Sequence, residues 1–96
     1  MTREDFLKTI KTPGTFMFKT DKKEGLVSTG LEDAFIWVDE RGFSDPSVDI
    51  GKGREPRNMG VYENTDEMLR LFRVDGELFA EAVLPQIQEL SQILYS

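Results

Sequence analysis

Apolar and polar residues recur at two different spacings along the chain, and each spacing predicts a different kind of element. In residues 2–12, the apolar residues Phe6, Leu7 and Ile10 lie at helical spacing behind Thr2 and an acidic first turn. A hydroxyl side chain ahead of acidic residues is typical of a helix start, because it caps backbone N–H groups that have no partner within the helix. This segment therefore predicts a short amphipathic helix.

Four later segments are typical of β-strands. Residues 15–20 predict a strand with Phe16 and Phe18 on one face and Met17 on the other, and residues 26–29 follow after a polar turn. Gly30 either bulges one long strand or separates two strands, and we favour two. The next strand then spans residues 34–38, and residues 59–62 predict a short fourth strand. Together these segments predict an antiparallel meander.

Residues 34–38 are the only stretch in which five apolar residues are consecutive, and they include Trp37, the single tryptophan. A strand loses its alternation when both of its faces are covered. We therefore expect this strand at the centre of the core, with Trp37 between two layers of structure.

The C-terminal third carries two conflicting signals. Asn64, with Glu67 three residues later, predicts a short capped helix, whereas Asp75-Gly76 is typical of a tight β-hairpin turn. The apolar residues that follow nevertheless recur at helical spacing, and they are Leu78, Phe79, Ala82, Val83, Ile87, Leu90 and Leu94. We favour a helix over residues 77–94, kinked near Pro85 because proline removes a backbone hydrogen bond.

These elements predict an α+β fold for a single domain of residues 1–96. We expect an N-terminal helix, a small antiparallel meander sheet of three to four strands, and C-terminal helices packed on one face of the sheet. Residues 42–58 contain three glycines and two prolines, and they predict a long loop. The number of subunits stays open.

The amino-acid composition says little more about the fold, but it excludes several classes of function. The chain has no cysteine, no histidine and a net charge of −6. Histidine is the side chain best suited to proton transfer near neutral pH and the commonest metal ligand, so we expect no catalysis, no metal and no other cofactor. An acidic surface repels nucleic acid, and no apolar stretch is long enough to span a membrane. We therefore expect a cytoplasmic protein that is not an enzyme and binds neither nucleic acid nor membrane.

The distribution of charge predicts a protein-binding surface. In residues 63–96 there are seven acidic and two basic residues, a balance that would attract a partner protein with a basic surface. The residues that we expect to contact such a partner are Phe43, Lys52, Arg54 and Arg57 on the loop, with Glu63, Asp66, Glu67, Glu77 and Glu81 on the acidic side. A stoichiometric inhibitor of the immunity-protein type, or a regulatory accessory protein, fits this pattern.

An alternative function uses the loop of residues 42–58 as a lid over an anionic ligand. Its basic side chains would bind a carboxylate or phosphate group, and nearby oxygen donors would act as acid or base. The basic residues are Lys52, Arg54 and Arg57, and the acid or base candidates are Asp45, Asp49 and Tyr62. The protein would then be a small ligand-binding domain, or an enzyme that works without histidine and cysteine.

Overall fold

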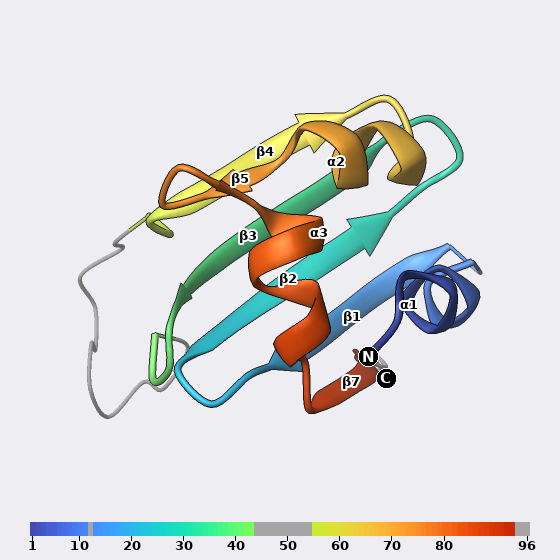
Figure 1. The fold of residues 1–96 in the computed structure, drawn as a ribbon. Coiled ribbons are helices and arrows are strands. Elements are labelled where there is room, and N and C mark those ends of the chain that lie inside the picture. The colour runs from blue at the N-terminus through green and yellow to red at the C-terminus, as the bar shows by residue number, and fades with distance from the viewer. Residues whose placement is uncertain (12, 44–54, 94–96) are drawn as a thin grey trace.

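A computed structural model describes residues 1–11, 13–43 and 55–93 of the chain. The strands in these residues are β1 Gly14–Lys19, β2 Lys23–Thr29, β3 Ala34–Glu40, β4 Asn58–Tyr62, β5 Arg73–Val74, β6 Glu77–Leu78 and β7 Glu89–Ile93. The helices are α1 Arg3–Thr9, α2 Thr65–Leu71, α3 Phe79–Ala82 and a 3₁₀ turn, η1 Leu84–Gln86. Figure 1 shows that the helices cover one face of the sheet, which confirms the predicted α+β class.

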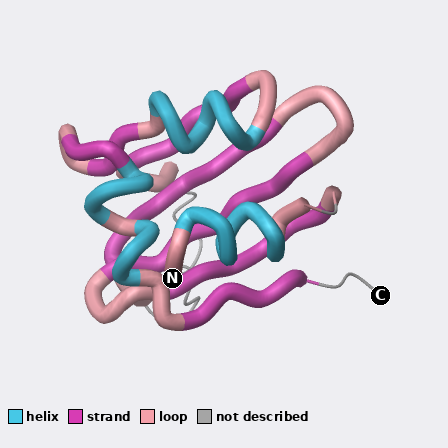
Figure 2. Tube along the Cα trace, turned by 45° about the vertical axis from the view of Figure 1, so that its right-hand side comes forward, coloured by secondary structure: helices cyan, strands magenta, loops and turns pink. Residues whose placement is uncertain are grey.

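The main sheet contains five antiparallel strands in the order β4-β3-β2-β1-β7, among the residues described. Its first four members in the chain form the predicted meander. The choice of two strands on either side of Gly30 is also confirmed, because β2 pairs with β3 from Lys23 opposite Glu40 to Thr29 opposite Ala34. Figure 2 shows the same sheet from a second angle, with the helices again on a single side.

Two helix starts follow the predicted capping chemistry. The Thr2 hydroxyl accepts a hydrogen bond from the backbone N–H of Asp5 at 3.1 Å, and the side chain of Asn64 accepts one from the N–H of Glu67 at 2.8 Å. The Glu67 carboxylate reaches back to the N–H of Glu63 at 2.9 Å. Both caps satisfy backbone donors that the first helical turn leaves without partners.

The predicted helix over residues 77–94 is wrong, and the hairpin signal before it is correct. Asp75 and Gly76 have φ angles of 52° and 88°, and they form the turn between β5 and β6. Positive φ at both central residues is what a two-residue turn with the twist of a hairpin requires. The local turn signal therefore outweighs the helical spacing of the apolar residues that follow it.

Of the described residues in that predicted helix, only four are α-helical. Pro85 lies in η1 rather than at a kink, since its missing N–H and fixed φ suit the first turn of a new segment. The chain then turns extended at Ile87, and the N–H of Gln88 donates to the carbonyl of Lys19 at 2.8 Å. This contact begins the pairing of β7 with β1, which adds a fifth strand to the three or four that the sequence predicts.

Phe79, the first residue of α3, is the centre of the core between the two layers. Its ring centroid lies 5.8 Å from Phe6 of α1, 5.6 Å from Phe18 of β1 and 5.8 Å from Phe72 after α2. All four rings are buried. Phe79 therefore contacts residues from three separate parts of the chain. It follows directly after the hairpin of β5 and β6, which places it over the sheet.

The helices that the structure describes cover one face of β3, so the expectation of cover on both faces is confirmed for that face and stays a prediction for the other. Ala34, Ile36 and Val38 are fully buried under the helices, while Phe35 and Trp37 point to the opposite face and are half-buried. The strand thus keeps a period of two in burial although every residue of the run is apolar. Trp37 lies outside the core between the layers.

Candidate protein-binding surface

The face of the sheet that points away from the helices is unusually apolar, and we call it the outer face. Its side chains alternate along each strand with those that enter the core, and cross-strand register places them in rows. The apolar members are Met17, Leu26, Phe35, Trp37, Met59 and Val61. A sheet with one covered face usually presents polar side chains on the other, so this composition departs from the expected pattern.

Register fixes how these side chains adjoin. Met17 lies opposite Leu26, Leu26 opposite Trp37, and Trp37 opposite Met59, which gives one apolar row across β1, β2, β3 and β4. Phe35 lies opposite Val61 in the row beside it. Directly opposed residues in antiparallel strands approach within contact distance. The outer face therefore carries a continuous apolar patch, which polar positions of the same face border: Lys19, Glu24 and Asp39 on one side, and Thr15 and Ser28 on the other.

Exposure increases toward the edge of the sheet. The apolar outer-face side chains of β1, β2 and β3 are half-buried, whereas Met59 and Val61 of β4 are 49% and 64% exposed. Contiguous apolar surface of this kind commonly marks a site of interaction with another molecule.

Of the two predicted loop contacts that the structure describes, Phe43 and Arg57, Phe43 joins the outer face. It follows β3 in a turn, where its N–H donates to the carbonyl of Glu40 at 3.2 Å. Its ring centroid lies 5.2 Å from that of Trp37, at an interplanar angle of 56°. The pair places two aromatic rings side by side, and aromatic side chains are enriched at the centres of protein interfaces.

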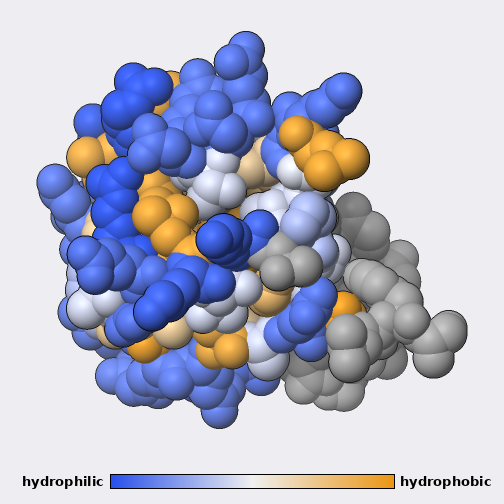
Figure 3. Space-filling view, turned by 90° about the vertical axis from the view of Figure 1, so that its right-hand side faces the viewer, coloured by the Kyte–Doolittle hydropathy of each residue, from blue (hydrophilic) through white to orange (hydrophobic). Residues whose placement is uncertain are grey.

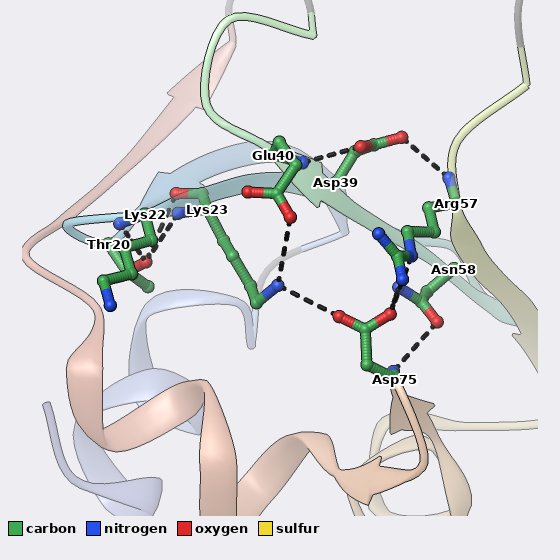
Figure 4. A network of polar contacts seen from close by, with 8 residues as sticks. All are labelled: Thr20, Lys22, Lys23, Asp39, Glu40, Arg57, Asn58 and Asp75. Atoms are coloured by element: carbon green, nitrogen blue, oxygen red, sulfur yellow. Dashed lines mark hydrogen bonds and ion pairs between the residues drawn. The ribbon is translucent and has the colours of Figure 1, made fainter.

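Arg57 belongs instead to a polar network at the end of the sheet (Figure 4). The carboxylate of Asp75 accepts from Lys23 Nζ at 3.1 Å and from Asn58 Nδ2 at 3.3 Å, and it pairs with Arg57 Nε at 2.9 Å. The hydrogen bond from Lys23 is the main cause that lowers the pKa of Asp75, followed by that from Asn58. This network ties the hairpin turn to β2 and β4.

A second carboxylate fixes the chain where it enters β4. Asp39 is buried, and its two oxygens accept from the N–H groups of Glu40 and Arg57. Arg57 is thus held through its backbone by one carboxylate and through its guanidinium by another. This arrangement gives Arg57 a structural role in the network, while Lys52, Arg54, Asp45 and Asp49 lie outside the described residues.

The predicted acidic contacts separate into two groups on the helical side. Glu63, Asp66 and Glu67 lie at the start of α2, and Asp66 forms an ion pair with Arg3 at 3.0 Å. Glu77 of β6 and Glu81 of α3 are exposed and line a shallow hollow beside Arg73. Among the described residues, these acidic side chains therefore lie apart from the pair of Phe43 and Trp37.

A cleft of about 760 Å³ separates α1 from the start of α2. Its apolar lining includes Leu7, Ile10 and Pro13, and its rim carries charges of both signs, among them Lys8 and Asp66. Figure 3 looks onto this end of the molecule and shows apolar surface between hydrophilic residues. The sequence did not predict this cleft, because its walls meet only through tertiary packing.

Tyr62 is unsuited to act as a base. Burial, and then the negative charge of Glu67, raises the pKa of its phenol. Its ring packs against Phe72 at 6.3 Å between centroids and folds over Gly60, where an added Cβ would meet ring atoms at 2.8 Å. Tyr62 therefore keeps its proton near neutral pH and serves the packing of α2 on β4.

Within the described ranges, no group of three or more acidic side chains lies close enough together to hold a metal ion. None of the helices in those ranges is long and apolar enough to cross a membrane. Comparisons of the chain with protein-family models, with curated proteins and with solved structures returned no match.

Proposed function

We propose that this protein is a protein-binding module, a stoichiometric inhibitor or regulatory accessory subunit rather than an enzyme, whose partner docks on the outer face. The observation that carries the proposal is the continuous apolar surface on the side of the sheet opposite the helices. A cytoplasmic location is part of the proposal and rests on the composition of the sequence.

Aromatic side chains would anchor the contact. Trp37 and Phe43 form a pair of rings, and Phe35 lies one row away on the same face of β3. Large rings in the middle of an interface lose much apolar area at low cost in conformational entropy, and they often dominate binding free energy. We expect these three residues to set the dissociation rate of the complex.

The charged residues would act on the rate of encounter. The net charge is −6, and the carboxylates at the start of α2 and on α3 lie on the helical side of the molecule. Such a potential attracts a basic partner over a distance and weakens as salt screens it. We therefore expect association, rather than dissociation, to slow as the ionic strength rises.

The experiment compares two variants that remove apolar surface from opposite sides. Leu26→Thr with Phe35→Thr changes the outer face, and Leu71→Thr changes an apolar side chain on α2 that is 47% exposed. Tagged protein is used to capture a partner from the cells that express it, and the purified partner is then titrated calorimetrically. We expect one partner bound at a one-to-one ratio.

The outer-face variant should weaken that affinity about tenfold or more, and the α2 variant should leave it within about twofold. Equal affinity of the outer-face variant and the unaltered protein would refute the proposed surface. Failure to capture a partner at low salt would count against the binding function itself.

A further inference from the structure

The two edges of the sheet differ in how they are protected. β4 and β7 end the strand order, so each has one side without a neighbouring strand in the described residues. β7 begins with Glu89 and exposes Ser91 and Gln92. β4 reads Asn-Met-Gly-Val-Tyr, without a charge or a proline, and its exposed side chains are apolar. Natural edge strands usually carry such blocking residues, because an unblocked edge pairs with other chains.

We propose that β4 pairs with β4 of a second copy of this chain, antiparallel and centred on Gly60, to form a homodimer with one continuous sheet. In this register Met59 lies opposite Val61 of the second copy, and the reverse contact repeats across the two-fold axis. These are the two apolar side chains of β4 that are most exposed. Pairing would remove them from water together.

The charges at the ends of β4 favour this orientation. Arg57 immediately precedes the strand, and Glu63 immediately follows it. Antiparallel pairing centred on Gly60 places Arg57 of each copy opposite Glu63 of the other, whereas parallel pairing would place like charges together. Both residues are exposed, and Arg57 keeps 62% of its side-chain surface accessible while it contacts Asp75.

Other registers match less well. A shift of two residues places Glu63 opposite Met59, or Arg57 opposite Val61, so a charge would face an apolar side chain in either direction. A shift of one residue would bring inner-face positions opposite outer-face positions. The register centred on Gly60 is therefore the self-complementary one.

Pairing at this edge extends the surface described above and goes beyond the proposed function. The two-fold axis runs perpendicular to the sheet, so the outer faces of both copies lie on the same side. A strand-pair interface is small, and we expect a dissociation constant on the order of 10 μM.

The first test measures sedimentation of the purified, full-length protein between about 1 μM and 1 mM. We expect a monomer at the low end and a dimer at the high end. Val61→Lys should give a monomer throughout, since a charge on an edge strand blocks pairing. Leu71→Lys adds the same charge on α2 and should dimerise like the unaltered protein. Circular dichroism would establish that both variants are folded.

The second test exchanges the charges. Glu63→Arg and Arg57→Glu should each weaken self-association about tenfold, because each creates two like-charge contacts in the symmetric dimer. Their equimolar mixture restores both opposite-charge contacts and should dimerise about as well as the unaltered protein. Arg57→Glu also removes the ion pair with Asp75, so circular dichroism must first establish that both variants are folded at the temperature of the measurement.

Three results would overturn the dimer. They are an unaltered protein that stays monomeric at about 1 mM, a Val61→Lys variant that dimerises normally, and a mixture that associates no better than its components. None of them bears on capture of a different protein by the outer face, because the sedimentation tests contain this chain alone.

Discussion

The two faces of the sheet are built from the same strands but differ in what lies over them. On the inner face, Phe18, Val27 and Ile36 are fully buried beneath α1, α3 and η1. On the outer face, Trp37 and Phe35 of the same β3 strand are only half-buried. Apolar composition alone therefore does not identify a core. Burial depends on a second layer, and within the described part of the chain the helices supply that layer on the inner face alone.

The largest loss of stability should follow the removal of an aromatic ring from the core beneath the inner face. Phe79→Ala removes a fully buried side chain that contacts the rings of Phe6, Phe18 and Phe72. We expect unfolding free energy to fall by about 3–5 kcal/mol in urea titrations, because a cavity would remain between the layers. Leu31→Ala is the control, since Leu31 is 96% exposed, and it should change stability by less than about 0.5 kcal/mol.

If Phe79→Ala does not fold, Phe79→Leu tests the same position with a loss of about 1–2 kcal/mol. A loss no larger than that of the Leu31 control would show that Phe79 is not the centre of the core.

Removal of the Trp37 ring from the outer face should lower the free energy of unfolding less than removal of the Phe79 ring. Trp37→Ala deletes a half-buried side chain whose contacts with described residues include cross-strand neighbours and Phe43. We expect a loss of about 2 kcal/mol in the same titrations, since part of the ring is already in water. A loss as large as that of Phe79→Ala would mean that the outer face is covered as firmly as the inner face, and the comparison would fail.

The sequence predicts most of the strands and helix starts that form the inner face, but it says little about the surroundings of the outer face. Strand alternation and helix caps are local, so the meander and the starts of α1 and α2 follow from neighbouring residues. The pairing of β7 with β1 joins Thr15 to Ile93 across nearly the whole chain, and no local pattern encodes it. The apolar run in β3 shows that both sides of the strand are apolar, but not which side the helices cover.

The candidate site was predicted in part for the same reason. Phe43 was found as an isolated apolar residue in the loop, but its contact with Trp37 is a tertiary one. The sequence predicts Arg57 as a partner contact or a ligand-binding charge, but nothing in its neighbours in sequence reveals the pairing with Asp75. The alternation of Met17 with Phe16 and Phe18 was the available signal for an apolar outer face.

The turn between β5 and β6 precedes Phe79 in the chain. Substitutions in this turn should lower the free energy of unfolding more than substitutions in an ordinary turn. Gly76 has a φ of 88°, and an added Cβ would meet nothing within 4 Å, so any penalty comes from the backbone alone. We expect Gly76→Ala to lower stability by about 1 kcal/mol. Gly76→Asn should lower it less, because asparagine adopts positive φ more readily. Equal losses in the two variants would argue against strain at this turn.

The smallest expected effect concerns the polar network at the end of the sheet. Hydrogen bonds from Lys23 and then Asn58 lower the pKa of Asp75 in the folded state. Its contribution to stability is therefore fully present above the unfolded pKa, near 3.8, and is lost as pH falls through the folded value. Because the carboxylate is 35% exposed and screened by solvent, we expect only a few tenths of a kcal/mol.

Asp75→Asn isolates this contribution, since asparagine also tolerates the positive φ of the turn. The difference in unfolding free energy between the variant and the unaltered protein should shrink as the pH is lowered from about 7 to about 3. It should also shrink when salt is raised to about 0.5 M. A difference that stays constant with pH would show that the charge of Asp75 does not contribute.

The most direct test of the account is collisional quenching of the single tryptophan by acrylamide. Trp37 lies on the outer face, so its fluorescence reports on that surface alone. The reference is the double variant Trp37→Phe, Phe79→Trp, which moves the fluorophore to a fully buried position. We expect acrylamide to quench Trp37 clearly more strongly than the tryptophan at position 79. Equal protection of the two would contradict an outer face that is open to a partner.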